Sequence, residues 1–563
     1  MSAGVGVRRR SLRPPLPGRA RLRQSLGLLR RPTEVHPARR REACRGCGRI
    51  GSRRAGRNSP HPRRLPVISA VLPEASLREL GRTAGSPDTL ALLVRDQHTR
   101  RLLLLRAVLD TVEAADTRVC PEPVRARLRE DWALLEAADR AGERAGAGAW
   151  PGAGIRASAA LDRLLYPLVG PWARNCLRLL GGGVVGGDGV VEEGTRRVWL
   201  LERDLAHFSA LAVAAAVRAR VPFAVRLVAR DGVLVIPSLG VLRTADAGEV
   251  PVDVALRGER MTFRQQGAAA ADASVRLNAD GTSARSDTPA WTPAKVLPGL
   301  VPGAEAVPLD DADPYRVAGP QARQQDPSGP ANVDGAGWAG WLRSWTGTAA
   351  LLRLGGEHRV AEAVAVLRCV VPLATPDVLT AQTRSTGSCS GTRREAFGAV
   401  LSSLPPNPVA FAATLVHEIQ HAKLAALSEM VVLHHAGPEE RFFAPWRPGP
   451  RRPYEALLHG VYSHLALSDF FQRCALATAM SPLQREFAWD RHARHREQVR
   501  AVLPAITEVD HLTPTGRLLV DMLTEEGVRM DADPPPAKAR ENARTYVDRL
   551  HRQWRLKNAA PSG

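Results

Sequence analysis

The pentapeptide HEIQH, residues 417–421, carries the side chains of this chain that could do metal chemistry. The apolar run AATLV precedes it and predicts a helix, on which residues four apart share one face. His417 and His421 can therefore bind one metal ion, with Glu418 beside them as a catalytic carboxylate. A chain of this composition would contain such a motif by chance only about 0.02 times. The alternative, a solvated polar face, fits poorly with neighbours such as Leu415 and Ile419.

A third protein ligand must come from outside the motif, because catalytic metal sites take three protein ligands and keep one position open. The natural source is a second long helix, predicted over residues 454–476. There Glu455 and His459 lie one turn apart, so either can face the first helix and complete the site. Tyr462 continues the same face. His464 is out of phase with His459 and is predicted to lie in solvent.

An arginine-rich loop joins the two predicted helices. The segment FFAPWRPGPRRP, residues 442–453, holds Trp446 and three arginines among rigid prolines. Arginine binds carboxylates through two parallel hydrogen bonds, so Arg447 or Arg452 could anchor the carboxylate of a bound cofactor or co-substrate. An ordinary surface loop with solvated arginines is the alternative interpretation.

The elements around the motif must hold the two helices and a substrate together. Residues 396–404 predict a strand that ends at a Pro-Pro turn, after which Asn407 and Pro408 begin the motif helix. This order places an extended edge close to the metal, where a peptide could pair with it. The predicted fold is α+β and predominantly helical. In it, the metal helix packs on the second ligand-bearing helix, and a small β-sheet has its edge strand near the metal.

Composition and periodicity divide the chain into five regions. They are a disordered Arg-rich tail at 1–64, an N-terminal helical region at 65–180 that is interrupted at Pro167 and Pro171, a mixed β and loop region at 181–345, a metal-binding catalytic core at 346–480, and C-terminal helices at 481–563. The mixed region includes strands expected at 223–227 and 233–236. Residues 181–186 match the dinucleotide-binding pattern GxGxxG, but a helix precedes them, so we predict a loop.

The positive charge is concentrated in the tail. Residues 1–64 hold 19 arginines and two glutamates, a net +17 of the total +21, which leaves +4 for the other 499 residues. The nearly neutral remainder gives no basic field for nucleic acid. The tail has no apolar period, so we expect it to be disordered. An alternative is that translation begins later, near Leu65 to Ile68, and that the tail does not belong to the real protein.

The cysteine content and the hydropathy of the chain indicate the cellular compartment in which we expect the protein. Seven scattered cysteines include one C-x-x-C, at Cys44 and Cys47, without the second pair of a zinc knuckle. Such usage suits a reducing cytoplasm. No apolar run reaches 18 residues, so no membrane span is expected. Neither nucleic acid nor membrane is an expected partner, and the oligomeric state does not follow from the sequence.

Three segments around and after the motif, together with one near the start of the helical region, resemble one bacterial family. Residues 401–430, 444–447 and 451–471 look like the HEXXH-motif proteins that modify ribosomally made precursor peptides, and residues 77–110 resemble the start of such proteins. Members occur alone or behind a radical S-adenosylmethionine domain. This chain has no C-x-x-x-C-x-x-C, so it resembles the stand-alone form. The resemblance covers most of residues 65–480.

The resemblance implies an iron(II)- and 2-oxoglutarate-dependent β-hydroxylase that acts on a side chain of a precursor peptide. His417 and His421 would be iron ligands, and His459 matches the family's downstream histidine and would be the third. Glu418 would then orient a ligand or the peptide. A familiar non-haem iron site has two histidines and one carboxylate, so Glu455 competes with His459.

Two other functions remain open from the residues alone. A zinc metallopeptidase would use His417, His421 and Glu455 as ligands, with Glu418 as the general base that activates zinc-bound water. A non-catalytic peptide-binding scaffold would retain the helices without the chemistry. Metal content together with 2-oxoglutarate-dependent succinate release would separate these possibilities.

Overall fold

The computed structural model describes residues 72–144, 158–181, 190–265, 272–278, 283–317, 329–375, 389–439, 442–447, 452–507 and 510–558. The tail expected at 1–64 and nearly all of the glycine-rich pattern at 181–186 lie outside these ranges. Within them the fold is α+β and mainly helical, as predicted. None of the described helices combines the length and the apolarity that crossing a membrane requires.

The first part of the chain is helical, as its leucine spacing predicts. It comprises α2 (Glu74–Gly81), α3 (Pro87–Ala114), α4 (Glu122–Arg144), α5 (Ala159–Leu164), α6 (Val169–Gly181) and α7 (Val190–Arg218). Helix α3 begins at Ser86, whose hydroxyl accepts a hydrogen bond from the amide of Thr89. Pro167 separates α5 from α6, as predicted. The interruption predicted at Pro171 is wrong, because this proline lies in the first turn of α6, where its missing amide donor is not needed.

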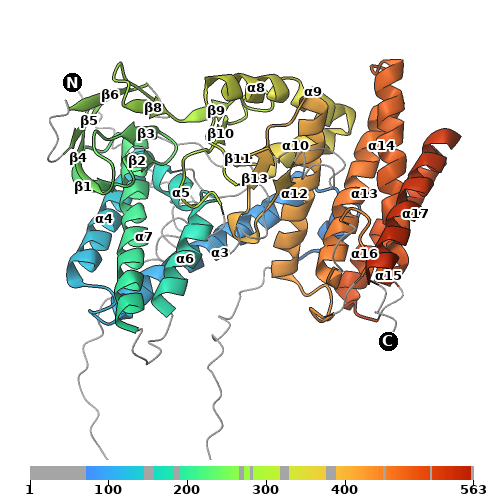
Figure 1. Cartoon of the computed structure of the whole chain (residues 1–563), viewed down its shortest axis with the longest axis horizontal. Helices are drawn as coiled ribbons and strands as arrows, with labels where there is room; N and C mark the ends of the chain where they lie inside the picture. The colour runs from blue at the N-terminus through green and yellow to red at the C-terminus, as the bar shows by residue number, and fades with distance from the viewer. Residues whose placement is uncertain are drawn as a thin grey trace, which may run out of the picture.

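Antiparallel strands lie beside α7 at one end of the molecule (Figure 1). They are β1 (Phe223–Ala229), β2 (Val233–Ile236), β3 (Gly240–Arg243), β4 (Val250–Arg257), β5 (Arg260–Gln265), β6 (Ala273–Leu277), β7 (Ala284–Arg285) and β8 (Trp291–Pro293). One sheet has the order β1-β4-β5-β6-β7, and a second has the order β2-β3-β8. Buried residues alternate with less buried ones along β4, the pattern of a sheet with one covered face. The strands predicted at 223–227 and 233–236 are confirmed.

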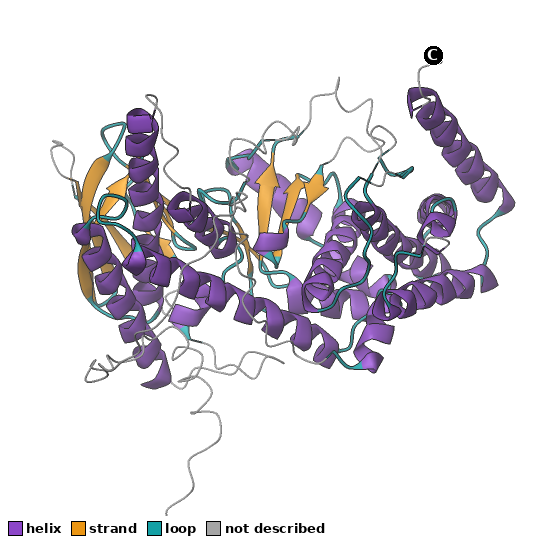
Figure 2. Ribbon diagram, turned by 90° about the horizontal axis from the view of Figure 1, so that it is seen from below, coloured by secondary structure: helices purple, strands orange, loops and turns teal. Residues whose placement is uncertain are grey.

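A third sheet lies between those strands and the C-terminal helices (Figure 2). Its strands are β9 (Lys295–Leu297), β10 (Val307–Leu309), β11 (Cys369–Leu373), β12 (Ser390–Gly391) and β13 (Ala399–Ser403), in the order β12-β13-β11-β10-β9. Strands β11 and β13 are parallel, and all residues of both are buried, as expected of a strand pair covered on both faces. The sheet joins strands from the regions predicted at 181–345 and 346–480.

The strand before the motif helix is not the edge of this sheet. Strand β13 falls inside the predicted range 396–404, but it pairs with β11 on one side and β12 on the other. The edge is instead β12, a two-residue antiparallel strand. Because β12 is so short and follows a stretch rich in Gly, Ser and Thr, local pattern does not reveal it. The sequence interpretation of residues 396–404 as the edge strand is therefore wrong.

The remaining helices build the side of the molecule that carries the motif (Figure 1). They are α8 (Gly335–Trp345), α9 (Thr348–Leu354), α10 (Glu357–Val366), α12 (Pro408–Met430), α13 (Tyr454–Leu476), α14 (Pro482–Arg500), α15 (Leu503–Thr507), α16 (Pro514–Arg529) and α17 (Ala537–Asn558), with short 3₁₀ turns η1 (Arg394–Ala396) and η2 (Met530–Ala532). One apolar core joins α12 and α13 to α2, to α3 and to the third sheet. Helix α13 has the bounds predicted from its sequence, 454–476.

Candidate metal centre

Helix α12 presents the motif in a fixed position because its first turn is anchored. The Asn407 side chain accepts a hydrogen bond from the backbone of that turn, and Pro408 occupies the first helical position. Phe411 is completely buried against the edges of Trp341 and Trp345, with centroid distances of 5.6 and 5.1 Å. Burying one such ring contributes about 1.5–3 kcal/mol, so the start of the helix is held by both capping and packing.

Three imidazoles meet where α12 packs against α13. His417 and His421 lie one turn apart on α12, and their Nε2 atoms are 3.1 Å apart. The Nδ1 atom of His421 is 3.3 Å from Nδ1 of His459 on α13. All three residues are partly buried, and each retains some exposure to solvent. The fold therefore brings together the three histidines that the sequence singled out as metal ligands.

Which ring nitrogens face one another determines whether the three imidazoles can bind the same metal ion. Two nitrogens that bind one tetrahedral ion at about 2.1 Å lie about 3.4 Å apart, so the Nε2 atoms of His417 and His421 are close to the required separation. His459 faces the other nitrogen of His421. Accordingly, no three His, Cys, Asp or Glu side chains in the described ranges form a metal-binding group as they lie. A three-histidine site requires the rings of His421 and His459 to turn relative to one another.

Burial keeps the three imidazoles in the neutral form. Desolvation lowers the pKa of His417 well below its usual value, and the neighbouring His421 and His464 lower it further. Desolvation lowers the pKa of His421 to about 3, and His459 adds to the effect. The pKa of His459 falls to about 4, through desolvation and then the charge of Arg394. Neutral imidazole is the form that binds a metal, so the donor set suits a transition-metal ion.

Glu418 lies against the edge strand of the third sheet. The Ser390 hydroxyl of β12 donates a hydrogen bond of 2.7 Å to Oε1 of this carboxylate. The other oxygen, Oε2, is buried and has no hydrogen-bond partner among the described residues. Burial raises the pKa of Glu418 to about 7, and the side chains of Ser390 and Thr392 partly oppose that rise. Its Oε1 is 4.0 Å from Nε2 of His417, so a protonatable carboxyl stands beside the histidines.

Glu455, the rival third ligand, is already engaged by another side chain. Its carboxylate forms an ion pair with Arg394 of η1, and both side chains are nearly half exposed, at 46% and 45%. Arg394 is also close enough to His459 to lower the pKa of that imidazole. No sequence pattern points to Arg394, because it lies 61 residues before Glu455 in a segment without periodicity. The structure thus adds an arginine that pairs with Glu455 and acts electrostatically on His459.

The interpretation of His464 as a solvated side chain is wrong. This residue is only 8% exposed, and its Nδ1 is 2.9 Å from Nδ1 of His495 on α14. Its ring meets the edge of His417 at a centroid distance of 5.4 Å and stacks on Trp446 at 4.9 Å. Helix α13 is buried on nearly all sides, so the residue out of phase with His459 faces a second helix rather than water.

The arginine loop reaches the site through its tryptophan. Trp446 packs so closely on α13 that a Cβ atom on Gly460 would lie 2.0 Å from the indole. Arg447 is exposed, whereas Arg452 is partly buried and pairs through its backbone with Phe442. Burial and the nearby charge of Arg447 lower the pKa of Arg452. The contacts thus place Trp446 on His464, whose ring in turn meets His417.

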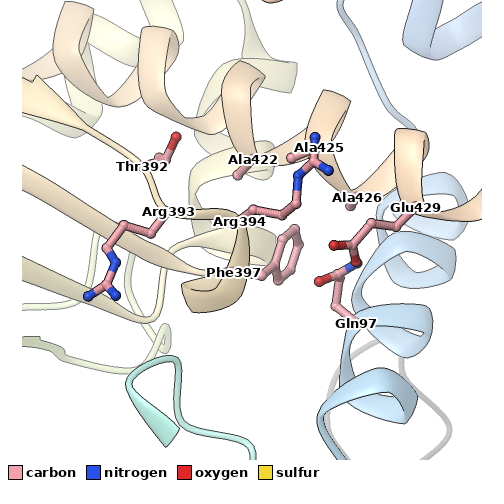
Figure 3. A pocket seen from close by; sticks show the side chains of 9 residues that line it. All are labelled: Gln97, Thr392, Arg393, Arg394, Phe397, Ala422, Ala425, Ala426 and Glu429. Atoms are coloured by element: carbon pink, nitrogen blue, oxygen red, sulfur yellow. The ribbon is translucent and has the colours of Figure 1, made fainter. Parts of the chain in front are cut away.

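A shallow pocket opens beside α12, next to the motif (Figure 3). Its volume is about 240 Å³, a figure that includes space open to solvent. Ala422, Ala425 and Ala426 of α12 line it, and the side chain of Arg394 points toward this helix (Figure 3). Arg393 points away, where it pairs with a neighbouring glutamate. Ala422 directly follows the motif, and Ala425 and Ala426 lie about one turn further along the helix, so the pocket is close to the motif in the chain and is lined by an arginine.

A buried polar cluster fixes the opposite side of α12. Lys423 has no exposure to solvent and donates to a carboxylate oxygen of Glu362 at 2.6 Å. Gln420 donates to the other oxygen of Glu362 at 3.0 Å. Arg359 lies between Glu362 and Asp469 of α13, 3.2 Å from each. Because isolated buried charges are costly, this paired network ties α12 and α13 into one relative position.

In comparisons with known proteins, the chain matches no protein-family model and no curated protein sequence.

Proposed function

We propose that this protein is an iron(II)- and 2-oxoglutarate-dependent hydroxylase that acts on the β-carbon of a side chain in a ribosomally made precursor peptide. The observation that carries the proposal is the meeting of His417, His421 and His459 across two packed helices, with nitrogens 3.1 and 3.3 Å apart. The resemblance of three segments to peptide-modifying HEXXH proteins supports the substrate class.

In this proposal the three neutral imidazoles hold iron, which supplies the oxidising chemistry together with 2-oxoglutarate and O₂. Each of the three rings keeps some exposure to solvent, which supports access of these molecules to the centre. His459 is favoured over Glu455 as the third ligand, because Glu455 is paired with Arg394 and His459 touches His421. Glu418 would orient the peptide or a ligand through the carboxyl that Ser390 holds.

Arg394 is a good partner for the distal carboxylate of 2-oxoglutarate. Its ion pair with Glu455 is nearly half exposed, and such surface pairs contribute little, typically about 0–1 kcal/mol. Exchanging Glu455 for an incoming carboxylate would therefore cost little. Arg447 and Arg452, which the sequence suggested for this role, remain alternatives on the neighbouring loop.

The peptide itself would bind along β12. This strand ends the sheet on the side of α12, and its Ser390 contacts Glu418. An extended peptide can add to such an edge through backbone hydrogen bonds, which would carry its side chains past the histidines. A cytoplasmic location is proposed as well, supported by the cysteines of the described ranges, which are buried and form no disulfide.

A zinc metallopeptidase is the second candidate, and one observation favours it. Glu418 has a pKa raised to about 7 and an oxygen without a partner among the described residues. A general base works best when its pKa is near the operating pH, so this carboxylate could activate zinc-bound water. Glu455 would then be the third ligand after releasing Arg394. A peptide-binding scaffold without chemistry is the third candidate.

The test is to load the metal-free protein with iron(II) or zinc and to follow 2-oxoglutarate and a candidate peptide. A hydroxylase releases succinate only with iron and O₂, and the peptide gains one oxygen while it stays whole. A peptidase cuts the peptide with zinc and without 2-oxoglutarate. Tight peptide binding without either reaction identifies the scaffold.

A further inference from the structure

A groove separates α14 from the beginning of α17 at the C-terminal end of the molecule, where the two helices run side by side (Figure 1). Ala493 of α14 packs against Ala539 and Ala543 of α17 in a small apolar contact. Beside this contact the surface opens into a groove of about 860 Å³, including space open to solvent. It is far larger than the pocket beside α12, and the proposed hydroxylase chemistry does not use it.

The groove is lined by more cations than anions. Four arginines face it, Arg496 and Arg500 from α14 and Arg540 and Arg544 from α17, against two carboxylates, Glu497 and Asp531. Asp531 accepts hydrogen bonds from both arginines of α14, at 3.2 and 2.6 Å. Among the described residues, the side chains of Arg540 and Arg544 form no hydrogen bond or ion pair, and both residues are exposed. The guanidinium groups of Arg540 and Arg544, on the α17 side of the groove, are therefore exposed to solvent.

The burial and hydrogen bonds of Arg496 show that the groove has an ordered, partly buried cation in its wall and is more than a patch of exposed arginines. The residue is only 7% exposed, and its guanidinium donates to the carbonyl of Gly527 at 2.6 Å and to Asp531. Its Nε atom is buried without a hydrogen-bond partner among the described residues. Burial lowers the pKa of Arg496, the negative charge of Asp531 partly opposes that effect, and the charge of Arg500 lowers the pKa further. A buried, incompletely paired cation in a groove wall is costly unless an anion approaches it.

The spacing of the arginines adds to this cost. Arg496 and Arg500 are four residues apart on α14, and so are Arg540 and Arg544 on α17. The two arginines of each pair therefore lie on one helix face, where their positive charges repel each other. Arg540 is also close to the N-terminus of α17, where the helix dipole already favours negative charge. An anionic ligand would relieve both effects at once.

From this geometry we infer that the groove between α14 and α17 binds a short acidic peptide segment through its carboxylates. Arginine forks on two facing walls match carboxylates that are spaced along an extended chain. A nucleic acid fits less well, because its evenly spaced phosphates need a continuous basic field. The basic field here is interrupted, because Glu497 and Asp531 lie in the groove and Glu541 and Asp548 are exposed on α17.

The occupant's identity is a separate step that rests on the proposed function. If the protein hydroxylates a precursor peptide, the acidic segment belongs to that peptide and holds it while another part reaches the histidines. Carboxylate binding in the groove does not depend on that chemistry, and it can be measured without metal. The two claims can therefore fail independently.

The experiment measures the binding of a labelled peptide rich in Asp and Glu to the metal-free full chain by fluorescence anisotropy. The matched probe is the same peptide with Asn and Gln. We expect the acidic peptide to bind more tightly and to weaken with added salt. The double variant Arg540→Gln/Arg544→Gln should weaken binding at least about tenfold, since charge-assisted hydrogen bonds are lost. Both side chains are exposed, so the fold should persist.

The matched control is Arg552→Gln/Lys557→Gln, which removes the same charge from exposed positions of α17 outside the groove. It should leave peptide affinity within about twofold. Equal loss in this control, equal binding of the Asn/Gln peptide, or tighter binding of an oligothymidylate would overturn the inference. So would inorganic phosphate that binds as tightly as the peptide. With an active enzyme, the Arg540/Arg544 double variant should raise the peptide KM and leave kcat unchanged.

Discussion

Arg394 forms an ion pair with Glu455 one helical turn before His459 on α13. The ion pair distinguishes Glu455 from His459, the two residues that compete to be the third metal ligand. Glu455 is held by a cation, whereas His459 lies 3.3 Å from His421. On this ground we propose a three-histidine centre, in which an incoming carboxylate would replace Glu455 at Arg394.

The third ligand can be identified from two substitutions. We expect His459→Ala to abolish stoichiometric metal binding, because it removes one of three nitrogen donors. Glu455→Ala should leave the metal content near one per chain, since this carboxylate is paired with Arg394 instead. Metal analysis after dialysis gives the answer. The opposite result, with metal lost only in Glu455→Ala, would transfer the ligand role to the glutamate and support the peptidase.

The co-substrate anchor can be located in the same way. Arg394→Lys should raise the KM for 2-oxoglutarate by about tenfold or more, because lysine cannot form two parallel hydrogen bonds to a carboxylate. Arg447→Lys, at an exposed position of the loop, is the matched control and should change the KM little. A larger effect at Arg447 or at Arg452 would restore the anchor to the loop that the sequence suggested.

Glu418→Gln separates the two kinds of chemistry. A peptidase needs this carboxylate to remove a proton from metal-bound water, so the change should cost it about 10²–10⁴-fold in kcat. A hydroxylase takes its oxidising power from iron and O₂ and should retain much of its turnover. The amide keeps the shape of the carboxyl and can still accept the hydrogen bond from Ser390. Turnover of both reactions should be followed in the same preparation.

Gly460→Ala tests whether Trp446 supports the site. Alanine normally stabilises a helix over glycine by about 1 kcal/mol. At Gly460, however, the new Cβ would lie 2.0 Å from the indole, so we expect a net loss of about 1–3 kcal/mol and weaker metal binding as Trp446 and His464 shift. Gly194→Ala, in helix α7, is the control, because a Cβ there meets nothing within 4 Å. Urea denaturation should show opposite signs for the two variants.

The helices that carry the site could be predicted because their signals are local. Asn407 and Pro408 mark the start of α12, and the apolar pattern of 454–476 sets the bounds of α13. Those two helices were enough to bring three histidines together. The edge strand was missed because β12 is two residues long and is defined by its pairing with β13 rather than by any period of its own.

Contacts between side chains that are distant in the sequence could not be predicted from it either. His464 was expected in solvent because it is out of phase with His459, but α14 covers that face of α13 and supplies His495. Arg394 meets Glu455 because η1 packs on α6 and α12, from where the arginine side chain reaches α13. Such contacts depend on how helices and sheets pack, and periodicity along one element carries no information about them.

The most direct test of the central claim is the visible absorption of the protein kept anaerobic with one equivalent of iron(II) when 2-oxoglutarate is added. The account predicts a new charge-transfer band that saturates at one 2-oxoglutarate per chain and is lost in His417→Ala, His421→Ala and His459→Ala. Iron that binds without producing the band, or a band that persists in all three variants, would contradict a three-histidine 2-oxoglutarate site.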